Sequence, residues 1–187
     1  LIDNLMDLTH LPYVHHHVPG GESMAKTAMT IEDRDASCRI VRSGKVPWTP
    51  FFDSIYGKEV AYEGLADFDA LSDFYGPELI RTSLPTITSI ESSDEVPKGF
   101  GAFWILHGIT PETETTTHYF GFATRNFRQG DEALDSFWLE SDTAIRQQDV
   151  NAIKAVEERL DVAVQVQKEL LVVADRPASK ARRIIKA

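Results

Sequence analysis

The sequence predicts a single α+β domain, in which an antiparallel sheet packs against a long helix near the C-terminal end. Three observations predict this class. The chain opens with leucines at helical spacing, continues through short β-branched and aromatic segments divided by prolines, and closes with a polar segment that carries apolar residues at helical intervals. With 187 residues the chain is long enough for one sizeable core.

Residues 1–17 are expected to be helical, because four leucines recur at helical spacing within the first eleven positions. Pro12 interrupts this pattern, so the helix should kink or change register there. A run of three histidines, His15 to His17, follows, and the Pro-Gly-Gly sequence at 19–21 is a turn signal.

Residues 23–128 are expected to be mainly β. The predicted strands are the segments rich in β-branched and aromatic residues, namely 36–41, 59–62, 79–90, 101–107 and 115–123. Residues 100–107 and 115–122 are expected to pair as an antiparallel hairpin, closed by a Thr-Pro-Glu-Thr turn at 110–113.

Residues 131–172 are expected to form the long helix, because apolar residues keep near-helical spacing there among Glu, Gln and Lys. The last twelve residues, Arg176 to Ala187, hold five basic side chains and no acidic one. This cluster predicts a solvated helix face, with a dock for an acidic partner as the alternative.

Composition excludes several classes of protein. The net charge of −10 makes nucleic acids and anionic membranes poor partners. No apolar run approaches the ~18 residues of a transmembrane helix, and the first residues are too polar for a signal peptide. Cys38 is the only cysteine, which excludes an intrachain disulfide and fits a reducing, cytoplasmic compartment.

Residue types that bind metals concentrate in the first fifteen positions. Asn4, Asp7 and His10 are spaced by three, so a helix would align them on one face. His15 lies five beyond His10, about 140° away on an ideal helix, so a distortion at Pro12 is needed to bring the imidazoles together. Two imidazoles and a distant carboxylate would make the facial triad of non-haem Fe(II) oxygenases, which leaves positions open for O₂.

The segment Asp3 to His15 (DNLMDLTHLPYVH) resembles the iron-binding motif of Rieske non-haem iron oxygenases, in the branch that contains vanillate and dicamba O-demethylases. The segments TPETE at 110–114, HYF at 118–120 and RNF at 125–127 recur in the same order in that branch. The resemblance covers nearly the whole of residues 1–187, as the mononuclear iron catalytic domain. It implies a helix-grip (Bet v 1-like) fold.

The resemblance implies that His10, His15 and Asp149 bind the iron. His16 is an alternative to His15, since three histidines are consecutive. Relatives usually have Glu before the aspartate ligand, whereas this chain has Gln148, so Asp142 is the alternative carboxylate.

Two more residues of the motif receive roles from the resemblance. Asp7 is expected to accept a hydrogen bond from a histidine ligand and to bridge to the Rieske histidine of a neighbouring subunit in a homotrimer. A carboxylate behind an imidazole fixes its tautomer and raises its basicity, so this role is physically reasonable. Asn4 is expected to lie near the iron without binding it.

The resemblance implies that His107, at the end of an apolar strand, points into the substrate pocket, with a core histidine held by backbone partners as the alternative. Asn126, Phe127 and Trp138 are further candidates for the pocket, and the alternative for the two aromatic residues is the core. A carboxylated substrate would need positive or hydrogen-bonding partners in so acidic a chain. His107, Asn126 and Arg81 are the candidates for that task.

The implied function is that of an oxygenase component. Fe(II) would activate O₂ to hydroxylate or O-demethylate a small aromatic compound such as a vanillate-like methoxy acid. Electrons would come from a Rieske [2Fe–2S] cluster, supplied by an NAD(P)H-dependent reductase or a ferredoxin. A Rieske cluster needs two cysteines and two histidines, so its domain is expected to precede Leu1.

Three other functions stay open. A ring or methyl-group hydroxylase of the same family would use the same site on another substrate. A helix-grip domain could instead be a non-enzymatic carrier of apolar ligands, without iron. A zinc hydrolase could use the same three ligands, although the sequence has no HExxH-type general base.

Overall fold

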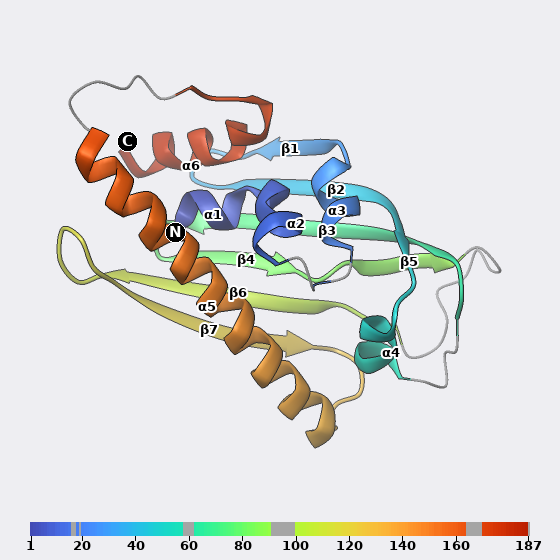
Figure 1. Cartoon of the computed structure of the whole chain (residues 1–187). Coiled ribbons are helices and arrows are strands. Elements are labelled where there is room, and N and C mark those ends of the chain that lie inside the picture. The colour runs from blue at the N-terminus through green and yellow to red at the C-terminus, as the bar shows by residue number, and fades with distance from the viewer. Residues whose placement is uncertain (16–17, 19, 58–61, 91–99, 164–169, 187) are drawn as a thin grey trace.

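A 7-stranded antiparallel sheet forms the frame of the molecule (Figure 1). The computed structural model describes residues 1–15, 18, 20–57, 62–90, 100–163 and 170–186. The strands run in the order β1-β2-β3-β4-β6-β7, and β5 pairs with the start of β3 while β4 pairs with its end. Their bounds are β1 Met29–Asp33, β2 Cys38–Pro47, β3 Leu65–Gly76, β4 Leu79–Ser83, β5 Thr86–Ile90, β6 Phe103–Pro111 and β7 Thr117–Arg125.

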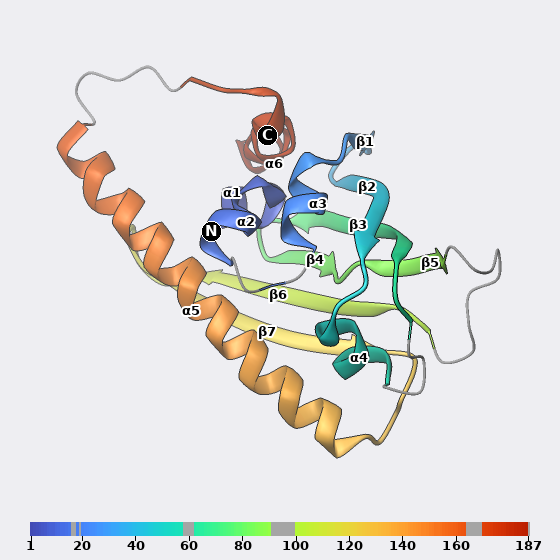
Figure 2. The same cartoon turned by 45° about the vertical axis from the view of Figure 1, so that its right-hand side comes forward.

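The long helix α5 runs diagonally across the β6–β7 end of the sheet (Figures 1 and 2). Helix α1 packs on α6 and on strands β3 and β4, and α2 packs on α5. The α+β class and the long helix on an antiparallel sheet are therefore confirmed. The helices are α1 Ile2–Met6, η1 Leu8–His10, α2 Leu11–Val14, α3 Gly21–Lys26, α4 Pro50–Tyr56, α5 Glu132–Ala163, η3 Val173–Asp175 and α6 Arg176–Lys186.

The first segment is a broken helix, and its break lies at Asp7, not at Pro12 as predicted. Asp7 has an extended backbone (φ −121°, ψ 111°), and its carboxylate accepts hydrogen bonds from the backbone N–H and the hydroxyl of Thr9. An acid at this cap position ends one helix and begins the next. Pro12 lies in the first turn of α2, where its missing N–H costs little.

Several predicted strand limits were wrong. The segment 79–90 is two strands, because Pro85 cannot continue a ladder of backbone hydrogen bonds. The predicted strand 59–62 lies mostly outside the described residues, and β3 begins at Leu65. Strand β1 and helices α3 and α4 were not predicted. The hairpin of β6 and β7 is confirmed, but its turn lies at 112–116, where Thr113 accepts hydrogen bonds from two following backbone N–H groups.

The late helix is shorter than predicted, because Leu170 to Val172 are not helical and 164–169 lie outside the described residues. The basic C-terminal cluster forms most of α6, which buries Pro177, Ala178 and Ala181. Two of its cations pair within the chain, Lys180 with Asp33 and Arg182 with Asp3. No helix of the described residues is long and apolar enough to cross a membrane.

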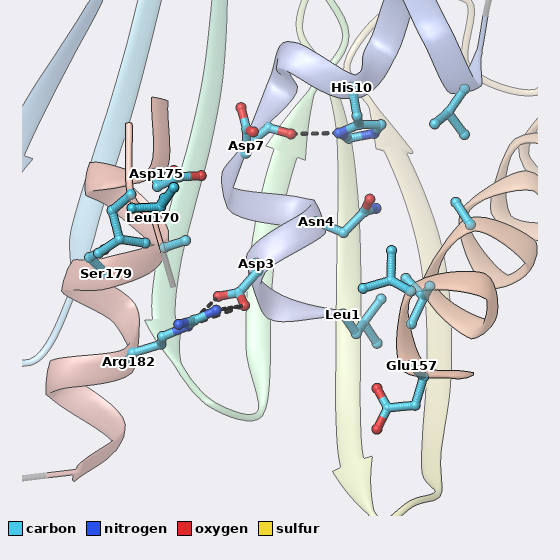
Figure 3. Close-up of a pocket in the computed structure, with 16 residues that line it drawn as sticks. Leu1, Asp3, Asn4, Asp7, His10, Glu157, Leu170, Asp175, Ser179 and Arg182 are labelled. Atoms are coloured by element: carbon cyan, nitrogen blue, oxygen red, sulfur yellow. Dashed lines mark hydrogen bonds and ion pairs between the residues drawn. The ribbon is translucent and has the colours of Figure 1, made fainter. Parts of the chain in front are cut away.

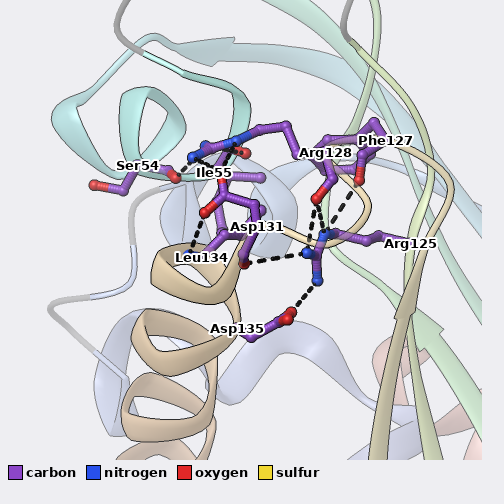
Figure 4. A network of polar contacts seen from close by, with 8 residues as sticks. All are labelled: Ser54, Ile55, Arg125, Phe127, Arg128, Asp131, Leu134 and Asp135. Atoms are coloured by element: carbon purple, nitrogen blue, oxygen red, sulfur yellow. Dashed lines mark hydrogen bonds and ion pairs between the residues drawn. The ribbon is translucent and has the colours of Figure 1, made fainter.

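The start of α5 is held by a network of two arginines and two aspartates (Figure 4). The Arg128 guanidinium donates to the carbonyl groups of Ser54 and Ile55 at the end of α4 and also binds Asp131. Asp131 caps α5 by accepting from the N–H of Leu134. Arg125 donates to the carbonyl of Phe127 and pairs with Asp135. This network fixes the rotation of α5, and hence which of its residues face the sheet.

Candidate metal centre

One face of α5 carries the residues that build the site. Leu134, Trp138, Asp142, Ile145 and Asp149 follow one another at intervals of three or four, so a helix aligns them along one side. Leu134 and Trp138 are buried and anchor the helix on the core. Asp149, about three turns beyond Trp138, is only 6% exposed. A carboxylate so deeply buried needs partners, because desolvation of a lone charge is costly.

The partners of Asp149 are two histidines of the broken N-terminal helix. The Nε2 atoms of His10 and His15 lie 3.5 and 3.0 Å from Oδ1 of Asp149. The three atoms that could bind a metal all lie within 4.8 Å of one another. Metal–ligand bonds of about 2.1 Å that meet at right angles place neighbouring ligand atoms about 3 Å apart. The two distances to Asp149 are close to this value, so the cluster is a candidate facial triad for one ion.

The tautomer of each histidine suits metal binding. Nδ1 of His10 lies 2.6 Å from the backbone carbonyl oxygen of Asp7, and Nδ1 of His15 lies 2.7 Å from Oε1 of Gln148. Both partners are oxygens that can only accept, so each Nδ1 carries the proton and donates it. With Nδ1 protonated, each Nε2 can give a lone pair to a metal once it carries no proton of its own; in the absence of a metal, the Nε2 proton of the His15 imidazolium binds Asp149. Such partners behind the ligands fix ring orientation and raise basicity.

The electrostatics of the metal-free cluster hold Asp149 ionised. Burial opposes the carboxylate, but hydrogen bonds from His15 and Asn4 outweigh it and lower the pKa of Asp149. Burial also opposes the imidazolium of His15, and the hydrogen bonds to Asp149 and Gln148 outweigh it and raise the pKa of His15. For His10 burial prevails and lowers the pKa. Protons and a metal therefore compete mainly for His15.

Asn4 and Asp7 flank the cluster. Nδ2 of Asn4 donates to Oδ1 of Asp149 over 2.9 Å, so Asn4 orients the carboxylate. Asp7 accepts from His10 through its backbone carbonyl, whereas the prediction had its carboxylate in that position. The carboxylate instead binds Thr9.

A cavity of about 110 Å³ adjoins the cluster. It has the order of size of a ~150 Å³ engineered cavity that binds benzene, so it suits a single aromatic ring. His10, His15 and Asp149 form one wall. The other walls are mainly apolar, with contributions from Leu5, Leu8, Leu11, Met24, Phe51, Leu84, Ile105 and Trp138.

A polar group lies in the same cavity, centred on His107. Its Nε2 lies 2.8 Å from the hydroxyl of Thr82, and its Nδ1 lies 2.6 Å from the hydroxyl of Tyr119 and 3.3 Å from Nη1 of Arg146. An arginine can only donate, so Nδ1 is the acceptor and Nε2 carries the proton. Burial, assisted by the Arg146 charge, lowers the pKa of His107 to about 3, so the ring is neutral at neutral pH.

The structure separates the predicted pocket residues into two groups. His107 and Trp138 line the cavity. Asn126 and Phe127 do not: the side-chain amide oxygen Oδ1 of Asn126 accepts from the N–H of Ala102, and Phe127 packs in the core. They stabilise the loop that joins β7 to α5. His16 lies outside the described residues.

Two predicted alternatives also lie elsewhere in the network. Arg81 pairs with Asp73 and covers the ring of Trp104, away from the cavity. Asp142 lines the cavity but binds Nε of Arg146 over 2.6 Å and is not one of the three clustered ligands. Arg146 itself was not predicted. The signal was available, since it precedes Asp149 by three and therefore shares its helix face.

A second, open groove of about 490 Å³ reaches the cluster from the other side. Asn4 and His10 line both the groove and the cavity, whereas Asp7 lines only the groove. Figure 3 shows Asp7 beside His10, with the Asp3–Arg182 ion pair further along the groove. Asn4 and His10 thus lie where the cavity and the groove meet.

Comparisons with known proteins show the family of the chain. A family model described as the vanillate O-demethylase oxygenase C-terminal domain matches residues 1–187. The toluene-4-sulfonate monooxygenase system iron-sulfur subunit of Comamonas testosteroni is 32% identical over 168 residues, which are 86% of this chain and 47% of that protein. A vanillate O-demethylase oxygenase subunit of a Pseudomonas species is 29% identical over 185 residues, 96% of this chain and 53% of that protein. The chain thus spans about half the length of these relatives.

Solved structures share the fold. The structure of dicamba monooxygenase bound to 3,6-dichlorosalicylic acid matches with a TM-score of 0.76 and 17% sequence identity. The match covers 99% of this chain and 53% of the dicamba monooxygenase chain. The structure of dicamba monooxygenase with non-heme iron and dicamba matches with a TM-score of 0.64 and 20% sequence identity, over 99% of this chain and 51% of the dicamba monooxygenase chain. Because the family model matches every residue, the chain belongs to the vanillate O-demethylase oxygenase C-terminal domains, the catalytic domains of Rieske non-haem iron oxygenase alpha subunits.

Proposed function

We propose that this chain is the catalytic domain of an oxygenase component that holds Fe(II) at His10, His15 and Asp149 and oxidises a single-ring aromatic compound. O-demethylation of a vanillate-like methoxy acid is the reaction we favour. One observation carries the proposal: the two imidazoles and the carboxylate meet in the wall of a mainly apolar cavity of about 110 Å³.

The donor set favours iron over other ions. Two imidazoles and one carboxylate on one face of an ion leave further positions free, the arrangement typical of Fe(II) enzymes that use O₂. Asn4 and Gln148 hold Asp149 and His15 in the orientation that the ion requires. Bound iron would supply the activation of O₂.

The chain's own residues would bind the substrate and exclude water. The apolar walls would pack on the aromatic ring, and Trp138 and His107 would contact it from α5 and β6. His107 stays neutral, with its Nε2 proton donated to Thr82, so it would orient a substrate without supplying a proton. The overall change for a methoxy group is ArOCH₃ + O₂ + 2e⁻ + 2H⁺ giving ArOH, formaldehyde and water.

The two electrons would come from outside these residues. Cys38 is the only cysteine of the 187 residues, so the chain itself cannot hold a Rieske [2Fe–2S] cluster. The open groove reaches His10 from the surface, and Asp7 lines it next to His10. This supports the predicted role of Asp7 as the bridge to a cluster on a neighbouring subunit of a homotrimer. An NAD(P)H-dependent reductase or a ferredoxin would reduce that cluster.

The test measures iron and product together. The protein is loaded with Fe(II) without oxygen, and its nitric oxide adduct is examined by electron paramagnetic resonance. We expect a non-haem iron signal, with formaldehyde released from 4-methoxybenzoate when hydrogen peroxide supplies both the oxygen atom and the electrons. Asp149→Ala and His10→Ala should lose iron and signal. Unchanged iron in either variant would contradict the ligand set.

The same experiment separates the alternatives. A methyl-group hydroxylase, the alternative favoured by the similarity to a toluene-4-sulfonate monooxygenase subunit, would convert 4-methylbenzenesulfonate to an alcohol without formaldehyde. A non-enzymatic carrier would bind aromatics but no iron. A zinc hydrolase would give no nitric oxide signal with its native metal.

A further inference from the structure

The two ends of the strand order, β1 and β7, are edges of the sheet that differ in composition (Figure 1). β1 is short, with five residues that include two acids, and Asp33 at its end pairs with Lys180 of α6. β7 has nine residues, and most of its side chains are exposed. An edge strand presents unpaired backbone groups to other chains, so proteins usually keep edges short or protect them with charges, prolines or a covering segment.

β7 lacks the charges and prolines that protect an edge. Residues 115–124 (TTTHYFGFAT) contain no Lys, Arg, Asp, Glu or Pro. β7 pairs with β6 on one side, and no described strand pairs with it on the other. The contrast between the charged edge and the uncharged edge indicates that another strand covers β7 in the assembled protein.

The contacts of β6 show in which direction its backbone groups point. The N–H of Ile109 donates to the carbonyl of Glu78, just before β4, and the carbonyl of Phe103 accepts from the N–H of Leu84, just after β4. The direction alternates from one residue to the next along a strand. Odd-numbered residues of β6 therefore bond toward β4, and even-numbered residues bond toward β7.

The register then identifies the backbone groups on the free side of β7. Leu106 lies opposite Phe122, so even-numbered residues of β7 bond to β6. The N–H and carbonyl groups of Tyr119, Gly121 and Ala123 point outward instead, and they have no partner among the described residues. These groups are a template for one more antiparallel strand.

The side chains on the outer face of β7 form an aromatic surface. Tyr119 points to the α5 face of the sheet, where its hydroxyl binds His107, so Phe120 and Phe122 point to the opposite face. They are 51% and 63% exposed. Gly121 lies between them, so the sequence Phe-Gly-Phe reads the same in both directions along the strand.

We propose that β7 is an interface at which a second copy of this chain adds its own β7, antiparallel, about a twofold axis beside Gly121. Gly121 faces Gly121 of the partner subunit in a hydrogen-bonded pair, and Tyr119 faces the partner subunit's Ala123 in the same way. Phe120 faces the partner subunit's Phe122 in the type of pair whose side chains lie closest. The surface is thus complementary to itself, as a twofold interface requires.

This interface leaves the metal centre and its groove free. The residues that line the open groove beside Asp7 come from outside β7. The contact is therefore compatible with the proposed homotrimer, in which it would join one trimer to a second, and it does not depend on the proposed function. It would also support one wall of the cavity, because Tyr119 lines the cavity and binds His107.

The first test measures the mass of the assembled protein by sedimentation velocity. We expect the wild type to contain twice as many chains per particle as Ala123→Pro or Phe122→Lys. Proline removes the outward N–H of residue 123, which does not bond to β6, and lysine is a common protection of natural edges. Tyr13→Lys is the matched control, because Tyr13 is 84% exposed on α2, and it should keep the mass of the wild type.

The second test measures the register. In a non-hydrogen-bonded antiparallel pair the Cα atoms lie about 4.5 Å apart, within the range that a disulfide spans. The double variant Phe120→Cys/Phe122→Cys should therefore form a disulfide between two chains under mild oxidation. Phe120→Cys alone should stay unlinked, because the diagonal distance to its copy is about 7–8 Å. Buried Cys38 is present in both variants and does not distinguish them.

Circular dichroism of each variant checks that the fold is intact, and the cysteine variants test the contact without a proline in the strand. A wild type with the same mass as Ala123→Pro and Phe122→Lys would overturn the interface, whether β7 is free or a different segment covers it. Equal cross-linking of the single and double cysteine variants would overturn the register about Gly121.

Discussion

Gln148 should control the iron affinity of the proposed site although it is not one of the proposed ligands. Its Oε1 accepts the Nδ1 proton of His15 over 2.7 Å, which directs the Nε2 lone pair toward Asp149 and His10. The variant Gln148→Leu keeps the size of the side chain and removes the acceptor. His15 is 1% exposed, so water cannot replace the lost partner.

The expected loss of metal affinity in Gln148→Leu follows from the two tautomers that His15 can adopt. If Nδ1 keeps its proton, a buried donor without a partner costs about 1–3 kcal/mol. If the proton moves to Nε2, it points at Oδ1 of Asp149, 3.0 Å away, and occupies the position that the metal needs. Either response weakens the site, and losses of a partner behind a ligand typically cost about 10- to 100-fold in metal affinity, about 1.4–2.7 kcal/mol.

The assay is competition for Fe(II) against a chelator of known affinity, without oxygen, with bound iron measured by plasma mass spectrometry. Gln148→Glu restores an acceptor and should keep or raise the affinity. Gln147→Leu is the matched control, because Gln147 is exposed and bonds only to Asn151 in the described contacts. If Gln148→Leu retained iron as tightly as Gln147→Leu, the tautomer argument would be refuted.

Two other predictions concern neighbouring groups. Since the pKa of His107 in the fold is about 3 and its ordinary value is 6.5, the stability it contributes is present above pH 6.5 and lost as the pH falls toward 3. We therefore expect the wild type to lose about 2 kcal/mol of unfolding free energy relative to His107→Gln between pH 7 and about pH 5, as measured in urea. If the difference between the two proteins stays constant, the histidine ring is not buried in its neutral form. Asp7→Asn should keep the helix cap and the iron, because asparagine caps a helix as well as aspartate does. This variant should lose the turnover that the reductase drives and keep the turnover that peroxide drives. If it loses both kinds of turnover, or neither, Asp7 has no role in electron transfer.

The fold was predictable where the signal is local. Helical leucine spacing, the β6–β7 pairing and the amphipathic late helix all follow from neighbouring residues. The position of the break in the first helix could not be predicted in this way. Pro12 fits the first turn of a helix, whereas Asp7 ends α1 because its carboxylate binds Thr9. The end of the late helix was also wrong, since the apolar residues at 170–172 continue the helical spacing without continuing the helix.

Part of the site could likewise be predicted from the sequence, and part could not. The two histidines lie in one short motif, and the resemblance that this motif carries led to Asp149, 134 positions beyond His15. The cavity's polar group depends instead on register. Arg146 can reach His107 because Gly121 lies opposite that histidine, a fact of β6–β7 pairing that residue types alone do not disclose. Asn126 and Phe127 were predicted to line the pocket because they belong to a motif of the family. In the structure this motif closes the loop before α5.

The two histidines differ in how easily their orientation can change. His10 donates to a main-chain carbonyl, which no side-chain substitution at position 7 removes, whereas His15 depends on the side chain of Gln148. His10 also lines both the groove and the cavity, while His15 lines only the cavity. Of the two proposed ligands, the one that lines the groove is thus fixed by the backbone, and the one that lines only the cavity is oriented by a side chain. Changes at residue 148 should accordingly alter iron affinity and pH dependence, whereas changes at residue 7 report on electron delivery.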